Sequence, residues 1–363
     1  LREGEAWTHA RLVADAWCAS FMWPKREGAP EPLTHATLLE LQRNPGGVSA
    51  EVRAQIRKLA EQYRFFHFHL AFPQVFRAPG PDEEPGPSGW VGGFDAVLGN
   101  PPWEHTELKE KEWFASRAPS VAGATGAKRK RLIAALEEED PALFEAYGAA
   151  KREADGMSHF ARNSGRYPLC GRGRINLYAI FAELSRTLQA ETGRVGFIVP
   201  SGIATDDTTK FFFQDLVDTG TLASLYDFEN RKGLFEEVHR SYKFCLLTLR
   251  GRGEAREGAP AEFAFFMLDV ADLQDPERRF ELTADDIARG FQVGPGNPLV
   301  DTIADHAAGR HAAYAGSALA RFHERWQPRS AAASMGLADP DTPPQAGEAG
   351  LAGLGPLEAV APW

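Results

Sequence analysis

The chain has 363 residues, of which 43% are hydrophobic and 25% charged, and its formal net charge at pH 7 is -10. This is enough chain for one large globular domain or two smaller ones with a packed core. No apolar run approaches the ~20 residues that span a bilayer, and the acidic balance argues against a surface that binds nucleic acid everywhere.

The three cysteines are Cys18, Cys170 and Cys245, which are far apart and outside any CxxC or Cys/His spacing. The sequence therefore predicts neither a disulfide framework nor a metal site, and a reducing, cytoplasmic location is expected. The N-terminus lacks the basic and then apolar layout of a secretory signal. It begins with Leu1 rather than Met, which indicates either a piece of a longer polypeptide or a processed start.

A helical segment is predicted at the N-terminus. Apolar and aromatic residues recur at helical spacing in residues 6–23 and again in residues 50–64. The Pro, Gly and acidic residues that follow, "RAPGPDEEPGPSG", predict a surface loop. We therefore divide this part of the chain into a helical segment, residues 1–76, and a loop, residues 77–92.

Strand-like and helical stretches alternate beyond residue 93. The apolar run "GRVGFIVPS" is of the kind that is buried on both faces of a parallel sheet. The alternation predicts an α/β fold with a doubly wound, Rossmann-like sheet, in which ligands bind at the carboxyl ends of the strands. The predicted strands cover residues 94–99, 193–201, 222–228, 241–249 and 262–270, and a predicted helix covers residues 175–191.

A further helix is predicted in "DDTTKFFFQDLVDTG". Asp206 or Asp207 is expected to cap its N-terminus, and Gly220 is expected to end it. The two carboxylates could instead act as an acid and a base. We favour the cap, because it explains them without chemistry.

A stiff turn, "NPPW", follows the first predicted strand. Asn100 precedes a proline and is biased to an extended backbone, while Pro101 and Pro102 fix their own φ and donate no hydrogen bond. The polar groups that remain are acceptors, namely the Asn100 side-chain oxygen and the main-chain carbonyls of Asn100 and Pro101. Trp103 adds a flat face of the size needed to stack on a nucleobase. The turn therefore suits a planar ring that carries an amino group.

Such a turn has a chemical use. An aromatic amine is a weak nucleophile because its lone pair is delocalised into the ring. Two acceptors that hold its hydrogens favour a pyramidal nitrogen, whose lone pair points toward an incoming methyl group. The simpler interpretation is a structural turn with Trp103 in the core. Its place at the end of an apolar strand favours the chemical interpretation.

Several stretches of the chain resemble the adenine-specific DNA methyltransferases that methylate an amino group, in particular the large enzymes of type IIG restriction-modification and phage-defence systems. The resemblance extends over about residues 6–290. The stretches that carry it are "GFDAVLGNPPWE" (93–104), "GRYPLCGRGRINLYAIFAEL" (165–184), "GRVGFIVPSGIATDDTTKFFFQ" (193–214) and "LYDFENRKGLFEEVHRSYKFCLLTL" (225–249).

The resemblance implies a partial S-adenosylmethionine-dependent methyltransferase sheet in a catalytic core over residues 93–290. It further implies S-adenosylmethionine as methyl donor and an adenine flipped out of double-stranded DNA. Asn100, Pro101, Pro102 and Trp103 would form the catalytic loop, and Asn100 would also contact the cofactor. By position, Phe235 matches an aromatic residue that packs against the flipped adenine. An ordinary core residue explains Phe235 equally well.

One motif of the resemblance is missing. The family's cofactor fingerprint is a Gly-rich turn after the first strand, upstream of the Asn-Pro-Pro-Trp. Residues 1–93 contain no such stretch, because "NPGGVS" (44–49) lies between helices and polar sequence. This predicts a fragment with an incomplete cofactor pocket, whose partners include the missing N- and C-terminal parts of the same enzyme.

A long basic insertion, residues 104–175, separates the turn from the next predicted helix. In residues 151–175, six basic residues stand against two acidic ones, which gives a net charge of +4. This local charge predicts a groove that follows DNA phosphates. The run "AKRKRL" is explained equally well by a solvated helix face, since "EEED" follows it. The residues expected to contact DNA are Arg162, Arg166, Arg172 and Arg174.

Two histidines of the insertion, His105 and His159, are interpreted as polar surface or loop residues, because nothing nearby completes a metal set or a triad. The last region, residues 291–363, is of low complexity, and its abundant Ala, Gly and Pro predict a disordered tail. Alternatively, the natural reading frame is lost near Gly290, where a tidy helical pattern becomes interrupted by Gly and Pro.

Three functions remain open. The leading hypothesis is the methylating module of an adenine-N6 DNA methyltransferase in a restriction-modification or defence system. A protein glutamine methyltransferase also uses Asn-Pro-Pro, usually with Tyr after it, but Trp103 and the basic insertion count against it. A non-catalytic DNA-binding remnant is favoured by the missing Gly-rich turn.

Overall fold

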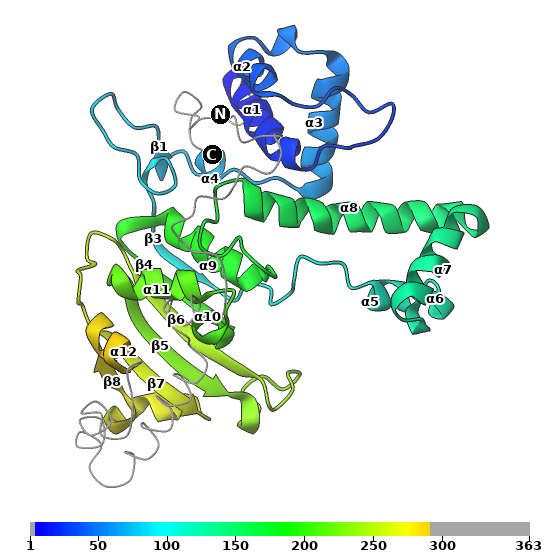
Figure 1. Ribbon diagram of the computed structural model, residues 1–363. Helices are drawn as coiled ribbons and strands as arrows, with labels where there is room; N and C mark the ends of the chain where they lie inside the picture. Colours follow the sequence, from blue (N-terminus) through cyan, green and yellow to red (C-terminus); the bar gives the residue numbers. More distant parts are fainter. Residues whose placement is uncertain (1–3, 291–363) are drawn as a thin grey trace. The chain divides into compact units, whose positions relative to one another are not determined.

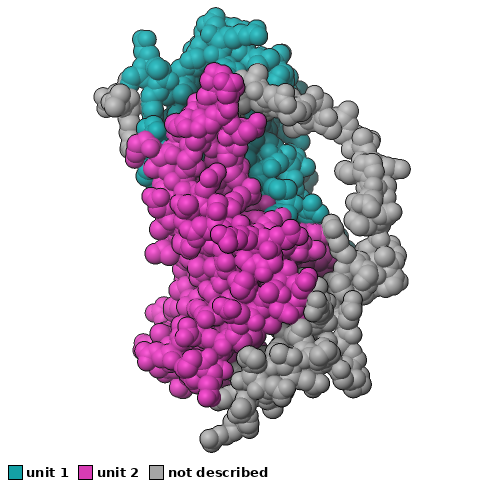
Figure 2. Space-filling model, turned by 90° about the vertical axis from the view of Figure 1, so that its left-hand side faces the viewer, with its two compact units in different colours: residues 1–73, 104–176, 363 teal, residues 74–103, 177–362 magenta. Residues whose placement is uncertain are grey.

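The computed structural model describes residues 4–290, which divide into two compact units (Figure 2). Within this range, unit 1 comprises residues 4–73 and 104–176, and unit 2 comprises residues 74–103 and 177–290. The predicted basic insertion thus belongs to the same unit as the N-terminal helices. No helix among residues 4–290 is long and apolar enough to cross a membrane. The predicted tail and the suspected frame change lie outside the described residues.

The first part of unit 1 is helical (Figure 1). Ser49 caps the helix of residues 50–63 by accepting a hydrogen bond from the Val52 N–H at 3.3 Å. Arg64 ends that helix in the left-handed region, at a φ of 53°. Leu41 and Ile56 are fully buried between the helices. Both predicted helices are confirmed. The elements are α1 (Glu5–Phe21), α2 (His35–Arg43), the 3-10 helix η1 (Pro45–Gly47), α3 (Ala50–Tyr63) and α4 (Phe68–Ala71).

The second part of unit 1 is also helical. Phe114 is its buried centre, with ring centroids 4.7 Å from Trp113 and 5.1 Å from Tyr147. The run "AKRKRL" lies on a helix that buries Ile133 and Leu136 on its opposite side, as a solvated helix face requires. The helices are α5 (Glu110–Ala115), α6 (Pro119–Gly123), α7 (Gly126–Glu139) and α8 (Pro141–Asn163).

Titratable side chains are buried together in unit 1. His67 Nε2 lies 2.8 Å from Asp15 Oδ1, and Asp15 is 5% exposed. The ring of His67 is 6.1 Å from the ring of His69. Burial, helped by the charges of His67 and Arg166, lowers the pKa of His69 from 6.5 to about 4. His69 is therefore neutral in the folded protein at pH 7.

This lowered pKa predicts a loss of stability in mild acid. The unfolded chain takes up a proton on His69 near pH 6.5, whereas the folded chain does so only near pH 4. The free energy of unfolding therefore falls as the pH drops through this window, by about 2 kcal/mol between pH 7 and pH 5. In urea titrations at the two pH values, His69→Gln should lose about 2 kcal/mol less than the wild type. An equal loss in both proteins would contradict the assignment.

Unit 2 is built on a six-stranded sheet in the order β3-β4-β6-β5-β7-β8. β3 pairs in parallel with β4, and β5 with β7, whereas β6 runs antiparallel to β4 and β5. The predicted strands and the α/β class are confirmed, in a mixed sheet. The strands are β3 (Phe94–Gly99), β4 (Gln189–Pro200), β5 (Leu222–Glu229), β6 (Lys243–Arg250), β7 (Ala261–Met267) and β8 (Phe280–Leu282), and β1 (Phe76–Arg77) pairs separately with β2 (Val91–Gly92).

The helices that connect β3, β4 and β5 lie on one face of this sheet (Figure 1). These strands follow one another in the same direction across the sheet, so right-handed crossovers place both connections on the same side. The helices of unit 2 are α9 (Leu177–Leu188), α10 (Gly202–Thr205), α11 (Lys210–Asp218) and α12 (Ala284–Gly290).

The structure confirms the predicted C-terminal end of α11 but not its predicted N-cap. Its N-cap is Thr209 and makes no side-chain capping bond, while Asp206 is instead the C-cap of α10. Asp207 forms an exposed ion pair with Lys210 at 2.6 Å. The prediction of an aspartate N-cap was therefore wrong, because an additional short helix ends at Asp206. Gly220 does end α11, with a φ of 62° that favours glycine.

The two faces of the sheet differ in burial. Val195 and Leu247 are 0% exposed on the face that the helices cover, whereas Ile198 and Leu246 on the other face are half-buried. Burial of "GRVGFIVPS" on both faces was therefore a wrong expectation for one of them. Among the described residues, β3 forms the edge of the sheet, and Leu98 is 82% exposed.

This difference predicts unequal costs for the same substitution. Leu98→Ala should change the free energy of unfolding by no more than about 0.5 kcal/mol, because the side chain is already in water. Leu247→Ala, in the same sheet, should cost at least about 2 kcal/mol, because it leaves a cavity in a packed interior. Urea unfolding of both variants measures the two costs, and equal values would show that β3 is covered in solution.

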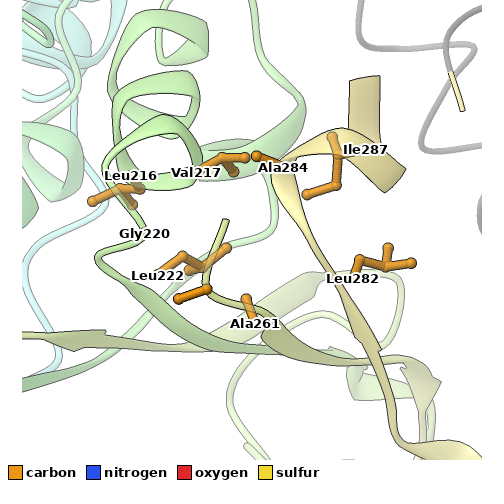
Figure 3. Close-up of a pocket in the computed structure, with 9 residues that line it drawn as sticks. Leu216, Val217, Gly220, Leu222, Ala261, Leu282, Ala284 and Ile287 are labelled. Atoms are coloured by element: carbon orange, nitrogen blue, oxygen red, sulfur yellow. The ribbon is translucent and has the colours of Figure 1, made fainter. Parts of the chain in front are cut away.

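A small apolar pocket lies between α11, α12 and the starts of β5 and β7 (Figure 3). Leu216, Leu222, Leu282 and Ile287 contribute to its lining, which has no charged side chain. The pocket is at the amino ends of β5 and β7, whereas the Asn-Pro-Pro-Trp turn follows the carboxyl end of β3. We interpret it as a packing defect of the core rather than a ligand site.

Candidate functional site

The turn "NPPW" directly follows β3, at the carboxyl end of that strand. Gly99 ends the strand beside Phe197, and a Cβ atom at residue 99 would lie 2.9 Å from Phe197 Cε1. A larger residue at position 99 would therefore force the Phe197 ring to move. Asn100 is exposed, whereas Pro101 is buried. The stiff part of the turn is thus anchored in the protein while its amide side chain reaches solvent.

Trp103 leads from this turn into an aromatic cluster. Its ring is half-buried, so one part packs in the interior and another part can contact a ligand. The ring centroid of Tyr242 is 6.5 Å away, with the two ring planes 30° apart. The aromatic cluster has Phe228, Phe244, Ala264 and Met267 as buried members and Trp103, Ile198, Tyr226, Leu234, Phe235, Leu246 and Leu273 packed around them.

Phe235 belongs to the same cluster, in edge-to-face contact with Phe244 at a centroid distance of 5.1 Å. Its loop is held by Asn230, which is 0% exposed. Asn230 Oδ1 accepts a hydrogen bond from the Phe235 N–H at 2.9 Å, and Asn230 Nδ2 donates to the carbonyls of Phe235 and Val238 at 2.9 and 2.8 Å. Trp103 and Phe235 thus pack around the same buried cluster, although no direct contact between their rings is recorded.

Asp227 ties the carboxyl ends of three strands together on the opposite face. Ser201, which follows β4, donates a short hydrogen bond to Asp227 Oδ1, and the Phe266 N–H in β7 donates to Oδ2 at 3.4 Å. Phe266 has a φ of 56°, an uncommon value for a side chain of this size. Burial raises the pKa of Asp227, and the bond from Ser201 partly offsets this effect. We assign Asp227 a structural role, because both of its oxygens have partners in the protein.

The predicted DNA-binding arginines lie in unit 1. Arg162, Arg172 and Arg174 are exposed and also brace their own segment: Arg162 Nη2 donates to the Gly173 carbonyl at 2.8 Å, and Arg172 Nε donates to the Pro168 carbonyl at 2.9 Å.

Arg174 and Arg166 differ in their surroundings. Arg174 forms an ion pair with Glu107 at 3.1 Å. Arg166 is half-buried, and burial lowers the pKa of its guanidinium. Arg166 is therefore less available to a phosphate than the other three arginines.

The loop between β5 and β6 supplies basic residues that the sequence analysis overlooked. In residues 230–242, three basic side chains stand against Glu236 and Glu237, a net charge of +1, and Lys243 begins β6. Arg231 and Lys232 are 68% and 59% exposed, and they form ion pairs with Glu229 at 2.8 Å and Asp269 at 3.5 Å. This loop also carries Phe235, so positive charge and the aromatic cluster occur in the same segment of unit 2. A count of charges along residues 225–249 would have found it.

No group of three or more metal-ligating side chains occurs among residues 4–290. His105 lies 3.2 Å from the Ile175 carbonyl through Nδ1, and His159 lies 2.9 Å from Asn163 Nδ2. Burial is the main reason that the pKa of His159 is lowered. Both histidines have local partners, as loop and surface residues do.

The described residues do not fit a complete pocket for S-adenosylmethionine. Within residues 4–290, β4 is the one strand that pairs with β3, and β1 and β2 form a separate two-stranded sheet. The glycines of "NPGGVS" lie in η1 between two helices of unit 1. No strand with a Gly-rich turn therefore stands beside β3 in this range, and the part that unit 2 supplies is the Asn100 turn.

These observations define a class: a mixed α/β sheet whose edge strand ends in an acceptor-rich turn beside an aromatic cluster. No model of a known protein family matches the sequence. No curated protein matches it either.

Three solved structures show the degree of structural similarity. An ATP-dependent type ISP restriction-modification enzyme, LlaBIII, bound to DNA is 8% identical, with a TM-score of 0.27, and the match covers 68% of this chain and 12% of that one. A putative class I S-adenosylmethionine-dependent methyltransferase from Listeria monocytogenes is 11% identical, with a TM-score of 0.28 and coverages of 74% and 67%.

The methyltransferase subunit of a type I restriction-modification system from Streptococcus thermophilus is 12% identical, with a TM-score of 0.32, and the match covers 79% of this chain and 58% of that one. TM-scores below 0.5 describe only partly overlapping folds. The function of this chain is therefore inferred from its own residues.

Proposed function

We propose that this chain is the base-binding module of a site-specific adenine-N6 DNA methyltransferase in a restriction-modification or defence system. The enzyme would take the methyl group from S-adenosylmethionine and act on an adenine flipped out of double-stranded DNA. The observation that carries the proposal is the exposed Asn100 on a stiff turn at the carboxyl end of β3, next to the aromatic cluster that contains Trp103 and Phe235.

The chemistry follows from the acceptors of the turn. The Asn100 side-chain oxygen and the Pro101 carbonyl would accept the two hydrogens of the adenine amino group. These bonds favour a pyramidal nitrogen with a localised lone pair, and such preorganised dipoles contribute several kcal/mol to a transition state. Trp103 and Phe235 would hold the face and the edge of the ring. S-adenosylmethionine, when bound, would supply the methyl group as an electrophile and be released as S-adenosylhomocysteine, and the surplus proton of the methylated amino group would pass to water.

No side chain of unit 2 is needed as a general base. Asp227 is the buried carboxylate nearest to the aromatic cluster in sequence, but both of its oxygens are bonded to Ser201 and Phe266. Its neighbour Phe228 points into the cluster, so Asp227 points to the opposite face of the sheet. Positioning and hydrogen-bond acceptors therefore account for the contribution of this chain.

Two basic segments would hold the DNA backbone. One contains the exposed Arg162, Arg172 and Arg174 of unit 1 and the half-buried Arg166, and the other is the loop of residues 230–242 in unit 2. Phosphate contacts of this kind give affinity that falls steeply with salt but carry no sequence information. The target sequence is therefore read by other residues.

Transfer of a radiolabelled methyl group tests the proposal. Two proteins are incubated with labelled S-adenosylmethionine and an adenine-containing duplex. One is the chain alone, and the other is the chain with any further N-terminal residues that its gene encodes. We expect label in DNA as N6-methyladenine for the longer protein. Label in protein and never in DNA would instead identify a glutamine methyltransferase. Salt-sensitive DNA binding without any label in either form would identify a non-catalytic remnant.

A further inference from the structure

Helix α7 carries its charges in two separate blocks. It begins with "GAKRKR", which contains four basic side chains and no acidic one, and it ends with Glu137, Glu138 and Glu139. The blocks are too far apart to form pairs at i,i+3 or i,i+4, because Leu, Ile, Ala or Arg occupies each position three or four places after Lys128, Lys130 and Arg131. A helix face that is only solvated typically interleaves opposite charges, and such pairs stabilise the helix.

The order of the two blocks also opposes the dipole of the helix. The start of a helix is its positive end, where basic side chains are unfavourable, and its end is unfavourable for acidic ones. The acidic block of α7 has a structural explanation in the next helix. Asp140 caps α8 by accepting a hydrogen bond from the Leu143 N–H at 3.0 Å, and negative charge is favourable beside the start of a helix. The basic block has no counterpart of this kind in unit 1.

One of the four basic side chains has a role in packing. Arg129 donates to the carbonyls of Val121 and Ala122 at 3.3 and 3.2 Å, and it lies 4.0 Å from a carboxylate oxygen of Glu110. The other three side chains are exposed, and the part of the chain that the structure describes gives them no ion pair. We call these three residues, Lys128, Lys130 and Arg131, the basic surface of α7.

The composition of α7 indicates the kind of ligand. A helix that binds a membrane surface presents large apolar side chains beside its basic ones. In α7 the large apolar residues Ile133 and Leu136 are buried in the cluster around Phe114, and the exposed uncharged residues are Gly126, Ala127 and Ala134. Charge without an apolar anchor suits the regular phosphates of a nucleic acid, of which a duplex presents one negative charge about every 1.7 Å.

The basic surface of α7 is distinct from the arginines already described. Figure 1 shows α7 at the start of the long helix α8. α8 has 23 residues and is therefore about 35 Å long, and Arg162 lies in its last turn. A contact at α7 can therefore be removed without changing the segment that contains Arg162, Arg172 and Arg174.

We propose that Lys128, Lys130 and Arg131 of α7 hold the phosphate backbone of double-stranded DNA without reading its sequence. This inference rests on the proposed function for the identity of the ligand and adds a third contact to the two basic segments. It also accounts for the charge order of α7, since charges that oppose the helix dipole are useful where a polyanion neutralises them.

The test compares the binding of three proteins to two DNA duplexes of unrelated sequence, by fluorescence anisotropy over a series of salt concentrations. The first is the wild-type chain, and the second is the triple variant Lys128→Gln/Lys130→Gln/Arg131→Gln. The third is a matched control that removes the same charge from exposed positions of α2 and α3, Arg43→Gln/Arg57→Gln/Lys58→Gln.

Each lost phosphate contact lowers the slope of log affinity against log salt concentration by about 0.9. The triple variant should therefore lower this slope by about 2 to 3, and to the same extent for both duplexes, because phosphates carry no sequence information. The control should keep the wild-type slope. The urea midpoint of the triple variant should equal or exceed that of the wild type, since the removed charges oppose the helix dipole.

The outcomes separate this inference from the proposed function. A triple variant with the wild-type slope would overturn the basic surface, while methyl transfer to DNA would still support the Asn100 turn. An equal loss in the control would also overturn it, because overall charge would then explain the binding. If the triple variant loses binding to phosphatidylserine vesicles or to poly-glutamate but not to DNA, the ligand is a membrane or an acidic protein, and the inference is wrong. A loss of slope confined to the triple variant, in a protein that methylates no DNA, would support the surface and refute the proposed function.

Discussion

Replacing Asn100 by alanine is expected to lower the rate of methyl transfer to DNA on the order of 100-fold to 1,000-fold, the loss that follows removal of one preorganised hydrogen-bond partner of a reacting group. The substitution removes the side-chain acceptor but keeps the carbonyl of residue 100 and both prolines. Because Asn100 is exposed, the free energy of unfolding should stay within about 0.5 kcal/mol of the wild-type value. Loss of activity without loss of stability identifies a chemical role.

The measurement is the initial rate of N6-methyladenine formation, with urea unfolding of the same preparations. Gln74→Ala is a matched control, because Gln74 is an exposed amide in unit 2 away from the turn. Asn100→Asp retains an acceptor and should keep part of the activity. Methyl transfer by Asn100→Ala at the wild-type rate would refute the proposed role of the turn in holding the adenine amino group.

The strands of unit 2 could be predicted from the sequence because their signals are local. The apolar run that ends at Gly99 and the two prolines after Asn100 are properties of a dozen adjacent residues, and the structure contains the strand and the turn where they were expected. The same holds for Gly220, which ends α11 at positive φ. The expected aspartate cap failed for a related reason, since the pattern did not show that a separate short helix ends at Asp206.

The positions of Tyr242 and Asn230 could not be predicted in this way. Tyr242 comes to lie 6.5 Å from Trp103, between ring centroids, because β6 returns antiparallel between β4 and β5. The polar side chain of Asn230 is buried because three main-chain groups of its own loop surround it. Composition likewise does not show which face of the sheet remains open. Leu98 is as apolar as Leu247, yet one is 82% and the other 0% exposed.

Asn230→Ala should lower the free energy of unfolding by about 3 to 5 kcal/mol, because it removes every side-chain hydrogen bond of a fully buried amide. The Phe235 N–H would lose its acceptor, and the carbonyls of Phe235 and Val238 would lose their donor. Each buried polar group left without a partner costs about 1–3 kcal/mol, and the cavity left by the side chain adds to this. Asn163→Ala, which removes an exposed amide, should cost less than about 0.5 kcal/mol.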